Sequence, residues 1–182
     1  WDKMRTNLLD SLLASNKLNN GQDKVAIFVP ENHGKQAKEA LALTADGGVL
    51  HNAVITQTVT NLNATALISL TRQILPGLDQ TGAVAKSIVI LSDGTDPISK
   101  GLSKQLIDDA KAQGVKIYTV FVPDSYQNKA LLEQLANETG GKPHQKSELG
   151  LLWGETLTVT QPMCRFTYRT ERANPKQLTL HS

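Results

Sequence analysis

One stretch of the sequence places carboxylates where they could do chemistry, KSIVILSDGTD at residues 86–96. Its four consecutive apolar residues predict a buried strand, and polar side chains follow at Ser92, Asp93, Thr95 and Asp96. In an open α/β sheet, ligands bind at the carboxyl ends of the strands. Asp93 is therefore the best-placed candidate, with three interpretations: a nucleophile, a metal ligand, or the N-cap of the next helix.

Other patterns associated with catalysis are absent from the sequence. There is no Gly-x-x-x-x-Gly-Lys-Ser/Thr loop, no Gly-x-Gly-x-x-Gly and no His-Glu-x-x-His. The single cysteine, Cys164, excludes an internal disulfide and a multi-cysteine zinc site, and is expected to be a small buried hydrophobe. The histidines lack ligand spacing, so surface or loop positions are expected for all of them: His33, His51, His144 and His181.

Composition narrows the class of protein further. The chain has 182 residues, of which 40% are apolar and 20% charged, as in a soluble globular protein. Its formal charge of +2 gives no sign of a dedicated nucleic-acid surface. No apolar run approaches the about 20 residues that span a bilayer, so no membrane insertion is expected.

Predicted strands and helices alternate along residues 1–160. After an opening amphipathic helix, strands are expected at 25–29, 40–43, 88–91 and 115–122, and helices near 47–59, 67–75, 102–110, 131–138 and 147–157. The strand 25–29 is wholly apolar, which is typical of a parallel sheet covered on both faces. The pattern predicts an α/β fold with a doubly wound, mostly parallel sheet and helices on both faces.

The pattern changes after Gln161. Residues 164–170 and 177–181 alternate at period two on either side of an Ala-Asn-Pro turn, which predicts a short β-hairpin. We therefore expect a boundary near residue 160, with an α/β domain at 1–160 and a hairpin at 161–182 that belongs to an adjacent β-domain.

The order of these segments resembles that of a von Willebrand factor A domain over residues 1–157. The resemblance is carried by four stretches: 63–70 (NATALISL), 86–94 (KSIVILSDG), 108–123 (DDAKAQGVKIYTVFVP) and 132–142 (LEQLANETGGK). It implies a non-enzymatic module for protein interaction or adhesion. Its partner would be a protein ligand or a neighbouring subunit.

The resemblance also implies a metal-ion-dependent adhesion site. By position, Thr65 matches the family's threonine ligand and Asp93 its aspartate. The family's first strand and its Asp-x-Ser-x-Ser loop have no match in this chain. Magnesium needs a full octahedral set of oxygen ligands, so Mg²⁺ or another divalent cation is expected only if an upstream segment supplies that loop. Ser92, Thr95, Asp96 and Ser125 are expected at the ligand-binding rim.

Two alternatives remain open. The same fold could serve as an assembly scaffold with a vestigial metal site, in an envelope or pilus-like complex. A phosphatase similar to haloacid dehalogenases is disfavoured, because the family's nucleophile position is occupied by Leu91.

The segment 165–170 resembles the strand that follows A domains in some bacterial exported proteins, beside an immunoglobulin-like sandwich. An extracytoplasmic location (periplasmic, cell-surface or secreted) is therefore expected.

Overall fold

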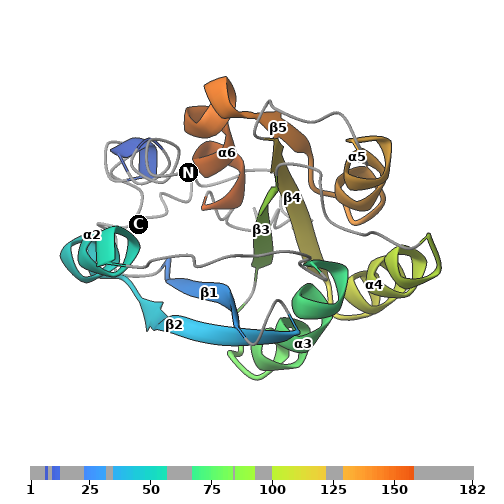
Figure 1. Cartoon of the computed structure of the whole chain (residues 1–182), viewed down its shortest axis with the longest axis horizontal. Coiled ribbons are helices and arrows are strands. Elements are labelled where there is room, and N and C mark those ends of the chain that lie inside the picture. The colour runs from blue at the N-terminus through green and yellow to red at the C-terminus, as the bar shows by residue number, and fades with distance from the viewer. Residues whose placement is uncertain are drawn as a thin grey trace, which may run out of the picture.

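The computed structural model describes residues 7, 10–12, 23–31, 35–56, 67–83, 85–92, 100–121 and 129–157. Residues 7 and 10–12 are helical. The elements that follow are, in chain order (Figure 1), β1 (Val25–Glu31), β2 (Gln36–Thr44), α2 (Gly47–Thr56), α3 (Leu67–Asp79), β3 (Lys86–Ser92), α4 (Lys100–Ala112), β4 (Val115–Phe121), α5 (Lys129–Glu138), β5 (Pro143–Gln145), the 3₁₀ helix η2 (Lys146–Glu148) and α6 (Leu149–Thr156).

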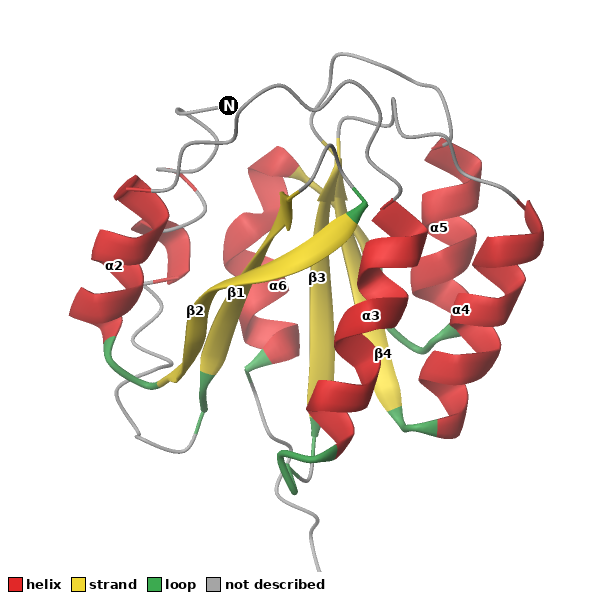
Figure 2. Cartoon of the chain, turned by 60° about the horizontal axis from the view of Figure 1, so that its bottom comes forward, coloured by secondary structure: helices red, strands yellow, loops and turns green. Residues whose placement is uncertain are grey.

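The described strands form two sheets. One is a parallel sheet with the order β3-β4-β5, and the other is an antiparallel pair of β1 and β2. Helices connect the parallel strands, as parallel pairing requires. Figure 2 shows β1 lying between β2 and β3, with α6 behind the strands and α3 in front of them.

Alternate residues of β4 face two apolar cores. Val115 and Ile117 pack with side chains of α3, α4 and α5, whereas Tyr118 and Val120 pack with side chains of α2 and α6. All four are almost completely buried. The chain therefore has a mixed α/β fold in which a parallel three-stranded sheet is flanked by helices on both faces, as the sequence predicted.

The prediction that β1 belongs to a parallel sheet covered on both faces was wrong. This strand pairs with β2 in antiparallel fashion rather than joining a parallel ladder, and Phe28 is 36% exposed. Only residues 32–35 connect the two strands, and a connection this short permits antiparallel pairing alone. The predicted edge strand at 40–43 is confirmed and is longer, extending over β2.

Local backbone geometry and hydrogen bonds show how two of the predicted helices begin and end. The Oδ1 atom of Asp46 accepts the N–H groups of Gly48 at 2.8 Å and Val49 at 3.1 Å, which caps α2. Gly114 follows α4 with a φ of 64°, the left-handed conformation that glycine adopts most readily. One prediction fails here, because α3 continues through Pro76 to Asp79 instead of ending before it.

The Thr139-Gly140-Gly141 turn determines where β5 begins. The Oγ1 atom of Thr139 accepts the backbone N–H of Ile117 at 3.0 Å. This contact lies two residues before Thr119, where the pairing of β4 with β5 begins. Gly140 has a φ of 82°, and a Cβ atom on Gly141 would overlap the carbonyl group of Ile117. The turn thus lets the chain approach β4 closely and start the edge strand beside it.

Two remaining predictions concern the C-terminal residues and membrane insertion. The C-terminal hairpin at 161–182 and the boundary near residue 160 lie outside the described residues. Within the described ranges, no helix is both long enough and apolar enough to cross a membrane.

Candidate functional site

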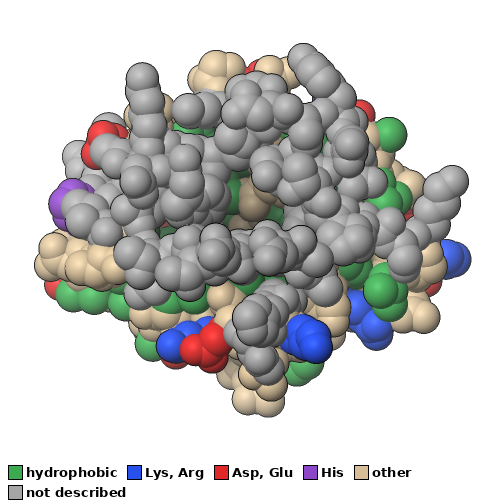
Figure 3. All heavy atoms as spheres, in the orientation of Figure 1, with side chains coloured by type: hydrophobic (Ala, Val, Ile, Leu, Met, Phe, Trp, Pro, Cys, Tyr) green, Lys and Arg blue, Asp and Glu red, His purple; other side chains and the backbone are tan. Residues whose placement is uncertain are grey.

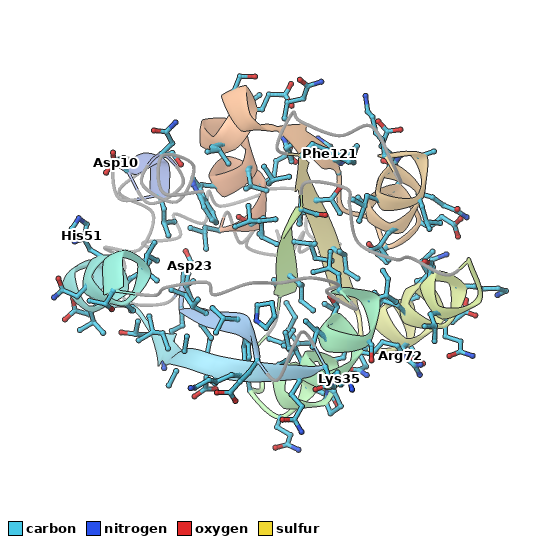
Figure 4. All side chains as sticks on the ribbon, viewed as in Figure 1. Asp10, Asp23, Lys35, His51, Arg72 and Phe121 are labelled. Carbon is cyan, nitrogen blue, oxygen red and sulfur yellow. The ribbon has the colours of Figure 1, made fainter. Side chains whose placement is uncertain are left out.

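The parallel register aligns the carboxyl ends of three strands. Ser92 of β3 pairs with Phe121 of β4, and Phe121 pairs with Gln145 of β5. These residues form one row across the sheet, and Figure 4 labels Phe121 at the end of β4 beside β5. The segments that follow β3 and β4 therefore start from the same edge of the sheet, where open α/β sheets bind ligands.

Of the predicted site residues, only Ser92 lies in a described segment. It is the last residue of β3 and is 5% exposed. The others lie outside the described residues: Thr65, Asp93, Thr95, Asp96 and Ser125. Asp93 directly follows Ser92 in the sequence, and Ser125 comes four residues after Phe121. The two segments that carry Asp93 and Ser125 therefore both start from this row of residues.

Leu91 occupies the position that a dehalogenase-like phosphatase would need for its nucleophile. It lies in β3 and packs, partly buried, against the apolar core on the α6 side of the sheet. An alkyl side chain in this position offers neither an attacking atom nor a metal ligand. Residue 91 therefore cannot be the nucleophile of such a phosphatase.

A polar cluster between the edge strand β5 and the helix α6 was not anticipated from the sequence. It consists of Tyr118 from β4, Lys142 just before β5, His144 within β5, and Glu155 from α6. The Nζ atom of Lys142 donates to Oε1 of Glu155 at 2.6 Å, and Nε2 of His144 lies 3.2 Å from its Oε2. The rings of Tyr118 and His144 are stacked, with centroids 6.2 Å apart. We refer to these four residues as the β5–α6 cluster.

Within the cluster, the pKa values of Tyr118 and Lys142 are raised and that of Glu155 is lowered. Burial raises the pKa of the Tyr118 phenol, with a further contribution from the charge of Glu155. Partial burial also acts to raise the pKa of Glu155, but hydrogen bonds and charges from Lys142 and His144 outweigh it and leave that pKa lowered. The carboxylate is thus held in its charged form by its two basic neighbours.

The expected surface or loop position of a histidine was wrong for His144. This residue lies in β5 and is 5% exposed. A three-residue strand has no periodicity that sequence could reveal, and its partner Glu155 comes eleven residues later from another element. His51 is partly buried in α2 and lies at the outer side of the molecule in Figure 4.

The described residues contain no group of three or more His, Cys, Asp or Glu side chains that could hold a metal ion. On the face shown in Figure 3, described basic and acidic side chains lie in small mixed groups rather than in one basic patch.

Comparisons with known proteins show likeness of fold. No protein-family model matches the chain, and no curated protein matches it. Its structure is similar to that of an aerotolerance-related membrane protein from Bacteroides fragilis, with 15% identity, a TM-score of 0.56, and 82% of this chain and 87% of that chain covered. It is also similar to the conserved hypothetical protein BatB from Bacteroides thetaiotaomicron, with 13% identity, a TM-score of 0.57, and 80% and 85% covered.

These identities are low, so the comparisons concern the fold alone. They support a von Willebrand factor A-like fold, the architecture that the sequence resemblance implied. Metal binding and adhesion are not part of that likeness.

Proposed function

We propose that the chain is a non-enzymatic protein-interaction module of the von Willebrand factor A type. Its ligand, another protein or a neighbouring subunit, binds at the carboxyl ends of the strands. The observation that carries the proposal is the row of Ser92, Phe121 and Gln145, because it starts the Asp93 and Ser125 loops from one edge. We also place the module outside the cytoplasm, and one structural neighbour is described as a membrane protein.

The proposed mechanism depends on a divalent cation. Thr65 would supply a hydroxyl oxygen to the cation and Asp93 would act mainly through water, provided that an upstream segment supplies the Asp-x-Ser-x-Ser loop. The bound cation would offer its positive charge to a carboxylate of the ligand protein, so binding would require the metal. Thr95, Asp96 and Ser125 line the rim, and the buried Ser92 holds the start of the segment that carries Asp93. Two protein oxygens are too few for tight magnesium binding, so the 182-residue chain is expected to bind Mg²⁺ weakly.

Calorimetric titration with magnesium chloride tests the metal site. We expect a dissociation constant no tighter than about 1 mM, weakened further by Asp93→Asn. Asp109→Asn is the matched control, since Asp109 pairs with Arg72 on the helical layer and is not at the strand ends. Micromolar affinity, or equal loss in both variants, would contradict the proposal.

Amide NMR shifts test the position of ligand binding. With Mg²⁺ and N-acetyl-aspartate as a carboxylate probe, changes are expected at Ser92, Phe121 and Gln145. Changes confined to β2 or α4, or changes that persist in Asp93→Asn, would place binding elsewhere.

One observation favours a second candidate, an assembly scaffold with a vestigial metal site. Ser92 is buried, so its side chain is poorly placed to meet a ligand directly. A scaffold would show no magnesium-dependent shift at the strand ends and no effect of EDTA on partner binding. Hydrolysis of p-nitrophenyl phosphate that disappears in Asp93→Asn would instead support an enzyme.

A further inference from the structure

The side chain of Gln73 in α3 binds the backbone at the start of β2. Its Oε1 atom accepts the N–H of Ala37 at 3.1 Å, and its Nε2 atom donates to the carbonyl oxygen of Lys35 at 3.1 Å. Figures 1 and 2 both show α3 beside this end of β2. Because the N–H of Ala37 donates to Gln73 and not to β1, it lies on the outer edge of β2, the edge away from β1. One carboxamide therefore occupies a donor and an acceptor that a neighbouring strand would use.

The outer edge of β2 is regular over a short stretch only. Residues 36–39 pair with β1 without interruption, and register shifts follow beyond Glu39. Alternate residues of a strand direct their backbone groups to the same edge, so Glu39 presents its N–H and C=O groups on the edge that Ala37 uses. Among the described residues β2 pairs with β1 alone, so no strand lies beside this edge. Residues 35–39 thus form an edge with which a further strand can pair once Gln73 moves away.

The charges along this edge are complementary to themselves. If two copies of β2 align antiparallel with Ala37 facing its counterpart, Lys35 faces Glu39 of the second copy, and Glu39 faces Lys35. Lys35 and Glu39 are both exposed, and opposite charges that face each other across two strands stabilise the pairing. Lys38 would face the neutral Gln36. Alignments centred on Lys38 or on Glu39 would instead bring like charges together, so the alignment centred on Ala37 is the one that the charges favour.

We propose that the outer edge of β2 is a dimerisation surface for a second copy of this chain, and that Gln73 restrains it. In the dimer, the N–H of Ala37 donates to the carbonyl of Ala37 in the second copy, and the carbonyl of Lys35 accepts the N–H of Glu39 from the second copy. Gln73 holds these same N–H and C=O groups in the single chain, so pairing requires its carboxamide to turn away. Gln73 is exposed, so it can turn into solvent without disturbing the apolar cores. The proposal does not depend on the metal site.

Sedimentation velocity of the 182-residue chain over a range of concentrations tests the restraint. Gln73→Ala removes both contacts, so the dimer should become tighter by about tenfold or more, because two hydrogen bonds no longer compete with it. Gln134→Ala is the matched control, since Gln134 is an exposed helical glutamine that donates to Glu138 of its own helix. It should leave association unchanged. Circular dichroism checks that each variant retains its fold. A Gln73→Ala chain that associates no more tightly than the unmodified chain would overturn the proposal.

Charge reversal in the Gln73→Ala chain identifies the surface. Glu39→Lys makes lysines face each other at both ends of the pairing and should weaken the dimer by about tenfold, whereas adding Lys35→Glu restores opposite charges and should restore it. A dimer that tolerates Glu39→Lys, or that the second reversal does not restore, would contradict the alignment.

Amide hydrogen exchange followed by NMR locates the contact. In the Gln73→Ala chain, exchange at Ala37 and Glu39 should slow as the concentration rises and the dimer forms. If association protects amides outside β2 instead, the dimer uses another surface and the proposal fails. Equal protection of these two amides at every concentration would show that another segment of the same chain covers the edge, which likewise excludes a second copy.

Discussion

The imidazole Nε2 of His144 lies 3.2 Å from Oε2 of Glu155, linking the edge strand β5 to the helix α6. The other carboxylate oxygen accepts a hydrogen bond from Lys142 at 2.6 Å. Because β5 contains only three residues, its ladder with β4 is short. Glu155 therefore adds a polar attachment to the apolar contacts that Leu152 and Trp153 make beneath it.

Replacing Glu155 with glutamine should weaken this attachment in a pH-dependent way. Partial burial acts to raise the pKa of Glu155, but the hydrogen bonds and charges of Lys142 and His144 have the larger combined effect. The pKa of Glu155 is therefore lowered from its ordinary value of 4.5. A lowered pKa adds stability that is present above the ordinary value and is lost as pH falls through the folded value. At pH 7 we expect Glu155→Gln to lower Tm by about 2–4 °C, and the difference should shrink below pH 4.5.

The control is Glu133→Gln, which breaks an exposed pair with Lys129 at 3.5 Å. Exposed pairs contribute little, so Tm should hardly change at any pH. Thermal unfolding followed by circular dichroism measures both variants. A pH-independent loss in Glu155→Gln would show that the carboxylate's charge is not the cause.

Tyr118 should titrate later than an ordinary tyrosine. Burial, followed by the charge of Glu155, raises the pKa of its phenol above 10.0. A raised pKa contributes stability below the ordinary value, and this stability is lost as pH rises through the folded value. In ultraviolet difference titration, Tyr118→Phe should remove the highest-pH component of the three tyrosines. Loss of an earlier component would contradict the assignment.

The central elements could be predicted because their signals are local. The apolar run of β4, the glycine after α4 and the Asp46 cap each lie within a few residues of the structure they determine. The alignment of the carboxyl ends of β3 and β4 could also be predicted, and the register of Ser92 with Phe121 confirms it.

What could not be predicted depends on contacts distant in sequence. An apolar run such as β1 does not reveal whether its neighbour is parallel or antiparallel; the short connection to β2 decides this. His144 resembled a loop histidine because the Pro143–Gln145 strand is too short for a pattern. Its burial results from α6 and from the Tyr118 ring, which no local signal connects to it.

Thr139 should be needed for its hydroxyl group rather than its shape. Its Oγ1 accepts the N–H of Ile117 at 3.0 Å and donates to a carbonyl at the end of α5, such as that of Leu135 at 3.0 Å. Thr139→Val keeps the volume but leaves a buried N–H without an acceptor, so unfolding free energy should fall by about 1–3 kcal/mol. Thr139→Ser keeps the hydroxyl and should cost less. Urea unfolding measures both, and equal losses would contradict the role.

Gly141 should tolerate no side chain, because the backbone of Ile117 occupies the space that a Cβ atom would need. Backbone cannot move aside as a flexible side chain can, so Gly141→Ala should force β5 away from β4 and cost about 1–3 kcal/mol. Gly150→Ala is the matched control: nothing lies within 4 Å of its Cβ position, and it is helical. That variant should gain about 0.5–1 kcal/mol. If urea unfolding shows Gly141→Ala to be neutral, the close contact between this turn and β4 is not maintained in solution.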